Sequence, residues 1–374
     1  MEEHQINIRM FRPMESYQKY GGVLTFARSV GYAVVKKPEG YTTAKVDQII
    51  QEYEKKSANE QQSTAKQYPN IITVVNETFA DIKVLGDFKT NEDYMPYFHS
   101  LKKNCVTGYT YASIVGGQTA NTEFELLTGN TLGFLSAGTT AFQLYIHGQM
   151  PSLVSNLKAE GYSGNKAMHP FNPYNYNRPA VYKDFGFTDF IDKFDFPKNV
   201  KRVREYISDE ANVDRIISEY EKNRKKTDQP FYMYNMTIQN HSPYDKDAAN
   251  FKQPIKIESS KYDAEANRYL NLIKYSDDSL KQLTGYFEKC KEPTIILFLG
   301  DHQPRLTDEF MNKITNGQYQ TWSSEQMMKR YQVPFVIWAN YDIKEQHIEK
   351  TSMNYIQSIL TKTAGVKMTG YQRF

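Results

Sequence analysis

Four side chains that could bind a metal ion or carry a proton each lie just after an apolar run. They are Glu77, His241, Asp301 and His302. The runs before them, at residues 71–75, 231–238 and 294–299, are nearly continuous in apolar residues, which is typical of strands buried on both faces of a parallel sheet. Because the carboxyl ends of parallel strands lie at one edge of the sheet, where ligands bind, these side chains are predicted to converge.

Glu77, Asp301 and His302 together make a mixed oxygen and nitrogen set that suits a hard or borderline divalent ion. Each motif also has an ordinary structural interpretation. An Asp-His pair after a strand is often a turn with a capping aspartate, and a glutamate at a strand end is usually exposed to solvent. These residues alone therefore leave both a metal site and a plain turn open.

One threonine lies in a glycine-bearing turn between a predicted strand and a predicted helix. Thr119 follows Gly116 and Gly117, and a helix is expected from about residue 119. A hydroxyl at a helix N-terminus lies among free backbone N–H groups and the positive end of the helix dipole, which favours a phosphate. The alternative is a capping box at residues 122–125, which would leave Thr119 in the loop before the helix. The pattern supports a nucleophile and a plain turn about equally.

The segment at residues 169–178 is polar, aromatic and interrupted by prolines, which predicts a loop. It begins with His169 and ends with Arg178. An arginine in such a loop can donate paired hydrogen bonds to phosphate oxygens, although most surface arginines do not.

Short β-rich runs alternate with helical ones from residue 68 onwards, which indicates a parallel α/β sheet. Beyond the runs already named, strands are expected at residues 108–115 and 333–338, and helices at 150–160, 269–289 and 354–363. The predicted fold class is α/β, with a central, mostly parallel sheet sandwiched by helices and a smaller C-terminal α+β part.

The chain is predicted to divide into a helical lead-in, residues 1–66, and a main domain, residues 67–374. Residues 43–54 open with Thr43 and carry apolar side chains at helical spacing, so we expect a helix that packs on the main domain. The polar stretch at 55–63 predicts the end of this helix and a linker.

The charge and the cysteine content of the chain argue against several classes of partner and site. The 46 Lys and Arg residues against 43 Asp and Glu give a net charge of +3, which is no reason to expect a nucleic-acid partner. The two cysteines, Cys105 and Cys290, cannot form a disulfide framework or a Cys-rich zinc site. No run approaches the roughly 18 apolar residues of a membrane span, so we expect the chain as given to be soluble.

Taken in order, the motifs resemble those of the sulfatase-like phosphoglycerol transferases, which include the lipoteichoic acid synthases, within the alkaline phosphatase/sulfatase superfamily. The resemblance covers about residues 20–340. The matching segments are Asn76-Glu77, Thr119 with Glu123-Phe124 and Leu127-Thr128-Gly129, His169 with Arg178, Asn240-His241-Ser242-Pro243-Tyr244, and Gly300-Asp301-His302. The sequence departs from the lipoteichoic acid synthases at two positions, where Tyr176 replaces a tryptophan and Phe171 an aspartate.

The resemblance implies an alkaline phosphatase/sulfatase-like fold and a set of roles for the matching residues. One Mn²⁺, with Mg²⁺ or Zn²⁺ as alternatives, is expected on Glu77, Thr119, Asp301 and His302. Thr119 is the expected nucleophile and His241 a second catalytic residue. The expected substrate-binding residues are His169, Tyr176, Asn177, Arg178 and His241. We expect Arg178 and His241 to serve the phosphoglycerol group rather than the fold, because both lie outside the predicted strands.

The resemblance also implies a reaction and a setting. Glycerol phosphate would move from a phosphatidylglycerol-type lipid, through a covalent intermediate on threonine, to a hydroxyl of a teichoic acid, polysaccharide or other surface glycan. Members of the family are tethered by membrane helices with the enzyme domain on the extracellular face, and we expect a monomer for the domain alone.

Three alternatives stay open. They are a phosphoethanolamine transferase of the same fold, a phosphoester or sulfoester hydrolase, and a non-catalytic module that binds anionic polymers. A formylglycine sulfatase is disfavoured because neither cysteine lies in a Cys-x-Pro-x-Arg context.

Overall fold

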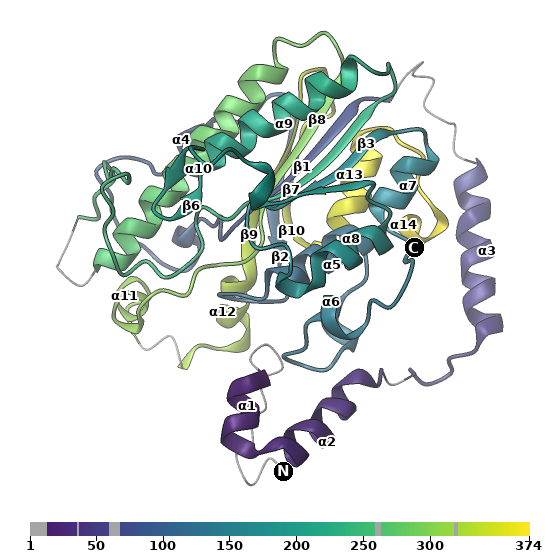
Figure 1. The fold of residues 1–374 in the computed structure, drawn as a ribbon, viewed down its shortest axis with the longest axis horizontal. Helices are drawn as coiled ribbons and strands as arrows, with labels where there is room; N and C mark the ends of the chain where they lie inside the picture. The colour runs from purple at the N-terminus through teal and green to yellow at the C-terminus, as the bar shows by residue number, and fades with distance from the viewer. Residues whose placement is uncertain (1–12, 36, 60–67, 259–262, 318–320) are drawn as a thin grey trace.

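The computed structural model describes residues 13–35, 37–59, 68–258, 263–317 and 321–374, and within these residues one large sheet dominates the fold (Figure 1). Its eight strands lie in the order β10-β2-β9-β8-β1-β7-β3-β4. The strands are β1 (Asn70–Asn76), β2 (Cys105–Tyr111), β3 (Ser163–Met168), β4 (Asp189–Ile191), β7 (Phe231–Met236), β8 (Thr294–Gly300), β9 (Gln332–Ala339) and β10 (Gln346–Ser352). Only β9 runs antiparallel to its neighbours, β2 and β8, so the sheet is mostly parallel, as predicted.

The strands at the centre of the sheet are apolar on both faces because helices cover both. β1 and β8 are buried along their whole length. Ile72 and Val74 of β1 belong to one hydrophobic core, and Ile71 and Val75 belong to another on the opposite face. This alternation is what a strand between two helical layers requires.

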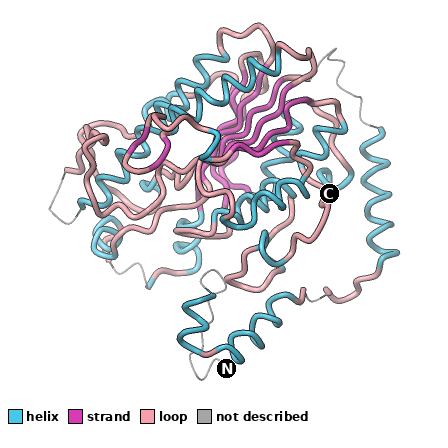
Figure 2. Tube along the Cα trace, viewed as in Figure 1, coloured by secondary structure: helices cyan, strands magenta, loops and turns pink. Residues whose placement is uncertain are grey.

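The two helical layers differ in their helices (Figures 1 and 2). One layer is built around the long helices α9 (Asp209–Arg224) and α10 (Ala264–Phe287), together with α4 (Pro96–Ser100) and α11 (Asp308–Ile314). The other contains α5 (Thr119–Thr128), α6 (Ala141–Leu144), α7 (Leu153–Ala159), α8 (Arg178–Phe185) and α13 (Ile356–Thr363). A short ribbon of β5 (Arg202–Val203) and β6 (Tyr206–Ile207) precedes α9, and α12 (Ser324–Met328) precedes β9.

Three helices precede the sheet domain: α1 (Pro13–Tyr20), α2 (Gly22–Ala33) and α3 (Thr43–Asn59). The predicted helix at 43–54 is present and longer than expected. It packs against α14 (Gly370–Arg373), and the rings of Tyr53 and Phe374 meet edge to face at 5.3 Å. Residues 60–63 of the predicted linker lie outside the described residues. None of the helices described is long and apolar enough to cross a membrane.

Several strands and helices begin or end at other residues than the sequence predicts. The strand expected at 108–115 is β2, which ends at Tyr111, and residues after it form the turn that leads to α5. The helix expected at 354–363 begins at Ile356, after a 3₁₀ turn at Met353–Tyr355. The helix expected at 269–289 begins earlier, at Ala264.

Candidate active site

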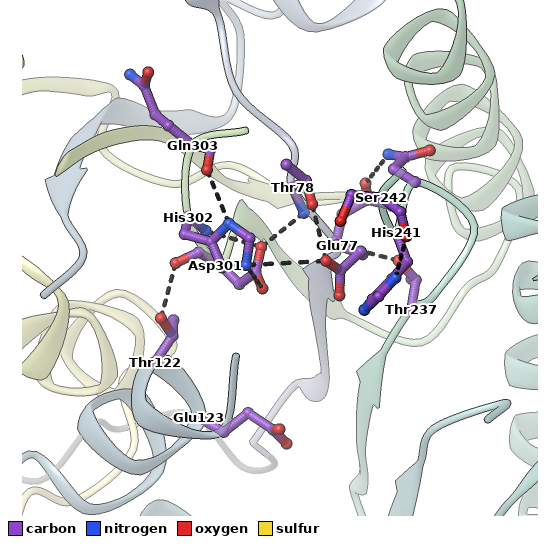
Figure 3. A network of polar contacts seen from close by, with 12 residues as sticks. Glu77, Thr78, Thr122, Glu123, Thr237, His241, Ser242, Asp301, His302 and Gln303 are labelled. Carbon is purple, nitrogen blue, oxygen red and sulfur yellow. Dashed lines mark hydrogen bonds and ion pairs between the residues drawn. The ribbon is translucent and has the colours of Figure 1, made fainter. Parts of the chain in front are cut away.

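The carboxyl ends of β1 and β8 bring three ligand-type side chains together (Figure 3). The two strands pair in register, with Asn76 opposite Gly300, so Glu77 and Asp301 leave the sheet side by side. One ligand atom from each of Glu77, Asp301 and His302 lies within 4.8 Å of the others, and all three residues are buried. The convergence predicted from the sequence is therefore present.

The backbone conformation and hydrogen bonds of Thr78 hold the carboxylates of Glu77 and Asp301 in position. Thr78 adopts a positive φ of 54°, an uncommon conformation for a residue with a branched side chain. Its N–H donates to Asp301 Oδ1 at 2.7 Å and its hydroxyl donates to Glu77 Oε1 at 2.8 Å. A side chain at Gly300 would place Cβ 1.8 Å from the Phe79 carbonyl oxygen, so the end of β8 requires glycine. Strain of this kind is characteristic of functional sites.

The cluster has the properties of a cation site. Asp301 Oδ2 and His302 Nε2 are buried without a hydrogen-bond partner among the described residues, and they lie 3.2 Å apart. Burial and the neighbouring Asp301 carboxylate raise the pKa of Glu77 to about 8. A buried carboxylate oxygen and an imidazole nitrogen without hydrogen-bond partners, next to a second buried carboxylate, are costly unless a cation binds them, so the donor set fits a divalent ion. The ordinary turn that the sequence left open would be expected to satisfy these atoms itself.

Thr119 is the first residue of α5, and three contacts attach its turn to the cluster. The N–H of Gly116 donates to the carbonyl of Gln303 at 3.0 Å, and Val115 forms a parallel bridge with the same residue. One helical turn after Thr119, the Thr122 hydroxyl donates to the Asp301 carbonyl at 2.8 Å. The N-terminus of α5 therefore lies against the segment that carries Asp301.

The start of α5 excludes the capping box that the sequence suggested at residues 122–125. Gln118, with φ 66° and ψ 36°, is the residue at the helix cap, and Thr119 is already helical. Residues 122–125 lie inside the helix, so they are not a capping box at its start. The Thr119 residue is only 7% exposed, and it lies in the first turn, where backbone N–H groups are free.

His169 follows β3 as Glu77 follows β1. It is buried, and its Nδ1 lies 3.0 Å from the Met236 carbonyl oxygen, so Nδ1 carries a proton and donates. Burial and the positive charge of Arg178 lower the pKa of His169 well below its usual value. The imidazole is therefore neutral.

Arg178 differs from the expectation that it serves a ligand rather than the fold, because it is almost completely buried and paired. Its Nε and Nη2 donate to Glu123 Oε1 of α5 at 3.1 and 2.7 Å. The hydroxyls of Tyr182 and Tyr234 donate to the other oxygen, Glu123 Oε2. Arg178 thus connects α8 to α5, a role that its sequence neighbourhood did not show.

The segment before Arg178 is a loop only in part. Residues Asn175–Asn177 form a 3₁₀ turn, and Arg178 begins α8. Tyr176 and Asn177 both have positive φ, 60° and 58°. The guanidinium carbon of Arg178 lies 5.0 Å from the centroid of the Tyr176 ring, which places Tyr176 beside the arginine.

His241 lies in the loop after β7, where its ring is held from two sides. Its Nδ1 lies 2.7 Å from the Ser242 carbonyl oxygen, so Nδ1 donates and Nε2 is the atom that can exchange a proton. The ring stacks on Phe171, with centroids 6.3 Å apart, and contacts the ring of Tyr206 at 5.8 Å. His241 is not part of the Glu77, Asp301 and His302 set.

Arg204 holds the backbone of the His241 loop. Its guanidinium donates to the carbonyls of Pro243 at 2.7 Å, Gln239 at 2.8 Å and His241 at 2.7 Å. Sequence reasoning missed this residue, because nothing in residues 202–207 signals that the ribbon reaches a loop so far along the chain.

A buried polar network beneath the site was also missed. Asp209 Oδ2 accepts from Asn76 at 2.7 Å and from Ser276 at 2.6 Å, and Asn240 donates to both Asn76 and Ser276. The network connects the end of β1 to the His241 loop through α9 and α10. The only sequence signal was the polar character of Asn76 and Asn240 beside buried strands.

Comparison with known proteins assigns the chain to a family. Residues 69–366 match the sulfatase family, which is most of the chain, and the chain belongs to that family. A Rhizobium meliloti protein named for cyclic β-1,2-glucan modification is 31% identical over 98% of this chain and 56% of its own length. The lipoteichoic acid synthase-like protein YvgJ of Bacillus subtilis is 27% identical over 62% of this chain and 36% of its own. The chain thus spans about half, or less, of the length of these relatives.

Solved structures share the fold. The Streptococcus pyogenes phosphoglycerol transferase GacH, in complex with sn-glycerol-1-phosphate, superposes with a TM-score of 0.74 at 19% identity, covering 91% of this chain and 86% of its own. The lipoteichoic acid synthase LtaP of Listeria monocytogenes gives 0.66 at 21% identity, with 86% and 80% covered. The alkaline phosphatase/sulfatase-like architecture predicted from the sequence is therefore confirmed.

Proposed function

We propose that the protein is a metal-dependent phosphoglycerol transferase that moves glycerol phosphate from a phosphatidylglycerol-type lipid to a hydroxyl of a surface glycan. The observation that carries the proposal is the attachment of the Thr119 helix start to the Asp301 segment. This attachment brings the first turn of α5 against the segment that carries Asp301, which supports a role for the Thr119 hydroxyl next to the donor set of Glu77, Asp301 and His302. GacH and YvgJ, as they are named, support the same class of reaction.

Glu77, Asp301 and His302 would hold the metal together with the Thr119 hydroxyl, and Mn²⁺ is the proposed ion, with Mg²⁺ or Zn²⁺ as alternatives. Such an ion supplies a Lewis acid that lowers the pKa of a bound hydroxyl and stabilises phosphoryl oxygens. Burial and the Asp301 carboxylate raise the pKa of Glu77, and a bound cation would lower it again.

The transfer needs two successive displacements at phosphorus, with Thr119 as the nucleophile in the first and the leaving group in the second. The Thr119 hydroxyl would first lose its proton to water, a loss that a bound divalent ion would favour. The Thr119 Oγ then attacks the phosphorus, the bond to the diacylglycerol oxygen breaks, and that oxygen takes a proton from His241 Nε2. An acceptor hydroxyl then returns its proton to Nε2 and attacks the same phosphorus, which releases Thr119. The hydrogen bond from Nδ1 to the Ser242 carbonyl fixes the ring for both steps.

The remaining residues bind the phosphoglycerol. Arg178 uses Nε and Nη2 on Glu123, and no described hydrogen bond uses Nη1, which leaves it for a phosphoryl oxygen. His169 stays neutral and contributes through Nε2, while Tyr176 and Asn177 line the approach beside Arg178.

The name of the Rhizobium relative favours a glucan among the acceptors, and teichoic acid or another polysaccharide stays an alternative. Since the chain spans part of its relatives, we propose that it is the domain of a membrane protein on the outer face of the membrane. A phosphoethanolamine transferase and a hydrolase are the competing functions.

Product analysis tests the proposal. Phosphatidylglycerol labelled in its headgroup glycerol is incubated with the protein, Mn²⁺ and a gluco-oligosaccharide. We expect the label on the oligosaccharide as a phosphodiester, with diacylglycerol released. Label found only as free glycerol phosphate would show a hydrolase, and turnover of phosphatidylethanolamine instead would show the other transferase.

A further inference from the structure

A groove opens directly beside His241. Its volume is about 520 Å³, and its lining includes Phe171, Lys193, Phe194, Lys198, Arg202 and Tyr206. The residues come from the loop after β3, the segment after β4 and the β5–β6 ribbon. We call it the His241 groove.

Two rings of the groove are the same rings that hold the histidine. Phe171 stacks on His241 and Tyr206 contacts it, while the centroids of Phe171 and Tyr206 lie 6.0 Å apart. The ribbon that carries Tyr206 also carries Arg204, which anchors the His241 backbone. An occupant of the groove would therefore contact two rings that pack directly on His241.

Aromatic faces dominate the surface that the groove offers. Phe194 is 71% exposed, so its ring face is available to a ligand. The Lys193 ammonium lies 5.9 Å from the Phe171 centroid and 4.9 Å from that of Phe194, so one donor sits over both rings. Ring faces with a few polar groups beside them suit an amphipathic ligand that has C–H faces and hydroxyl edges.

The charges in and beside the groove sum to a small positive value, since residues 192–206 carry five lysine and arginine side chains against three aspartate and glutamate side chains. Lys193, Lys198 and Arg202 line it with Glu205. Asp192 and Asp195 belong to the same loop, where the Asp192 carboxylate caps the turn at Phe194. An excess of two positive charges gives an anionic lipid surface only modest attraction, so the aromatic faces, rather than charge, argue for a sugar ring as the occupant.

We infer that the His241 groove is the acceptor subsite and that it binds a neutral sugar ring of the glycan, stacked on Phe194 and Phe171. The inference rests on the proposed function. In a double displacement through Thr119, the acceptor oxygen enters where the diacylglycerol oxygen leaves, and both meet His241. The sugar that presents this hydroxyl must therefore lie beside His241, where the groove is.

Direct binding tests the inference without turnover. The probe is an uncharged, linear β-1,2-linked gluco-oligosaccharide, titrated into the full chain by calorimetry. Phe194→Ala should weaken its binding about tenfold, because one stacking face is lost. Phe194→Tyr keeps the face and should keep the affinity. Phe194 is exposed, so its replacement should leave the fold intact.

Phe134→Ala is the matched control, since Phe134 is 83% exposed and lines a different groove, and its binding should equal that of the unchanged protein. Equal binding by Phe194→Ala, or no binding of the oligosaccharide by the unchanged protein, would overturn the inference. So would vesicles of phosphatidylglycerol that bind the unchanged protein but not Phe194→Ala, which would make the groove a membrane contact. Labelling of Thr119 by the lipid donor, measured on the unchanged protein without glycan, reports separately on the proposed function.

Discussion

Arg178 Nη2 lies 2.7 Å from Glu123 Oε1, and this ion pair is buried at the junction of α8 and α5. Both side chains are 2% exposed or less. Because α5 begins with Thr119, the pair connects the candidate phosphate-binding arginine to the helix that positions the candidate nucleophile. A residue proposed to bind substrate is thus also part of the fold.

Removing the arginine should therefore destabilise the protein. Arg178→Ala leaves the Glu123 carboxylate buried with two tyrosine hydroxyls and no cation, and we expect a loss of about 3–5 kcal/mol in the free energy of unfolding. Chemical denaturation measures it. Arg28→Ala on α2, where the arginine is exposed, is the control and should change stability by less than about 0.5 kcal/mol. Equal stability of the two variants would contradict a structural role for the pair.

The metal site predicts one bound divalent ion per chain. Asp301→Asn and Glu77→Gln should each abolish tight binding, because each removes a charged donor from a buried set. Elemental analysis of the purified proteins measures the ion. Asp228→Asn serves as the control, since that carboxylate is 96% exposed. Two tightly held ions per chain, or unchanged metal content in Glu77→Gln, would refute the assignment.

The sequence predicts the central sheet well because its strands carry a strong signal. The runs that became β1, β7, β8 and β9 are apolar on both faces, and this pattern depends on the run alone. It cannot give strand direction, so the antiparallel orientation of β9 was not foreseen. β3, with the sequence Ser-Gly-Asn-Lys-Ala-Met, and the exposed β10 were missed because few of their residues are apolar. Both depend on partners distant in the sequence.

The candidate site was predictable where it depends on strand ends and not where it depends on tertiary pairing. Glu77, Asp301 and His302 converge because parallel strands end at one edge. The burial of Arg178 depends on Glu123, and the position of His241 depends on Arg204. Glu123 and Arg204 are distant in the sequence from Arg178 and His241, so no local sequence pattern indicates these contacts.

The stability of the protein is expected to depend on pH because of His99, which lies outside the candidate site. The Asp81 carboxylate, 3.7 Å from Nε2, and a hydrogen bond from Nδ1 to Asp93 raise the pKa of His99 to about 9 from its usual 6.5. Burial opposes ionisation of Asp81, but the nearby His99 imidazole and hydrogen bonds from Tyr94 and the Lys83 N–H outweigh it and lower the pKa of Asp81. The protonated histidine is favoured in the folded state, so its contribution is full below pH 6.5 and is lost as the pH rises to about 9.

Urea denaturation across this range measures the loss. The free energy of unfolding should fall from pH 6.5 to 9, and His99→Gln should remove much of that slope. His147→Gln, at an exposed histidine, should retain it. The same slope in His99→Gln as in the unchanged protein would show that another group is responsible.

Arg204 is predicted to act through His241. Arg204→Lys can keep at most part of its contacts with three backbone carbonyls, so the His241 loop should shift and turnover should fall by about a hundredfold. Steady-state kinetics should show the loss in kcat, with a displaced pH profile, since the environment of the imidazole changes. A loss confined to thermal stability, with the pH profile unmoved, would assign Arg204 to the fold alone.

The central claim is that Thr119 carries the phosphoglycerol group between donor and acceptor. Its most direct test is mass spectrometry of the digested protein after incubation with a phosphatidylglycerol analogue and Mn²⁺ in the absence of acceptor. The account predicts a peptide containing Thr119 heavier by one phosphoglycerol group, a signal that disappears when a glycan acceptor is added and never forms in Thr119→Ala. Donor cleavage by Thr119→Ala at the rate of the unchanged protein, with no modified peptide in either, would contradict it.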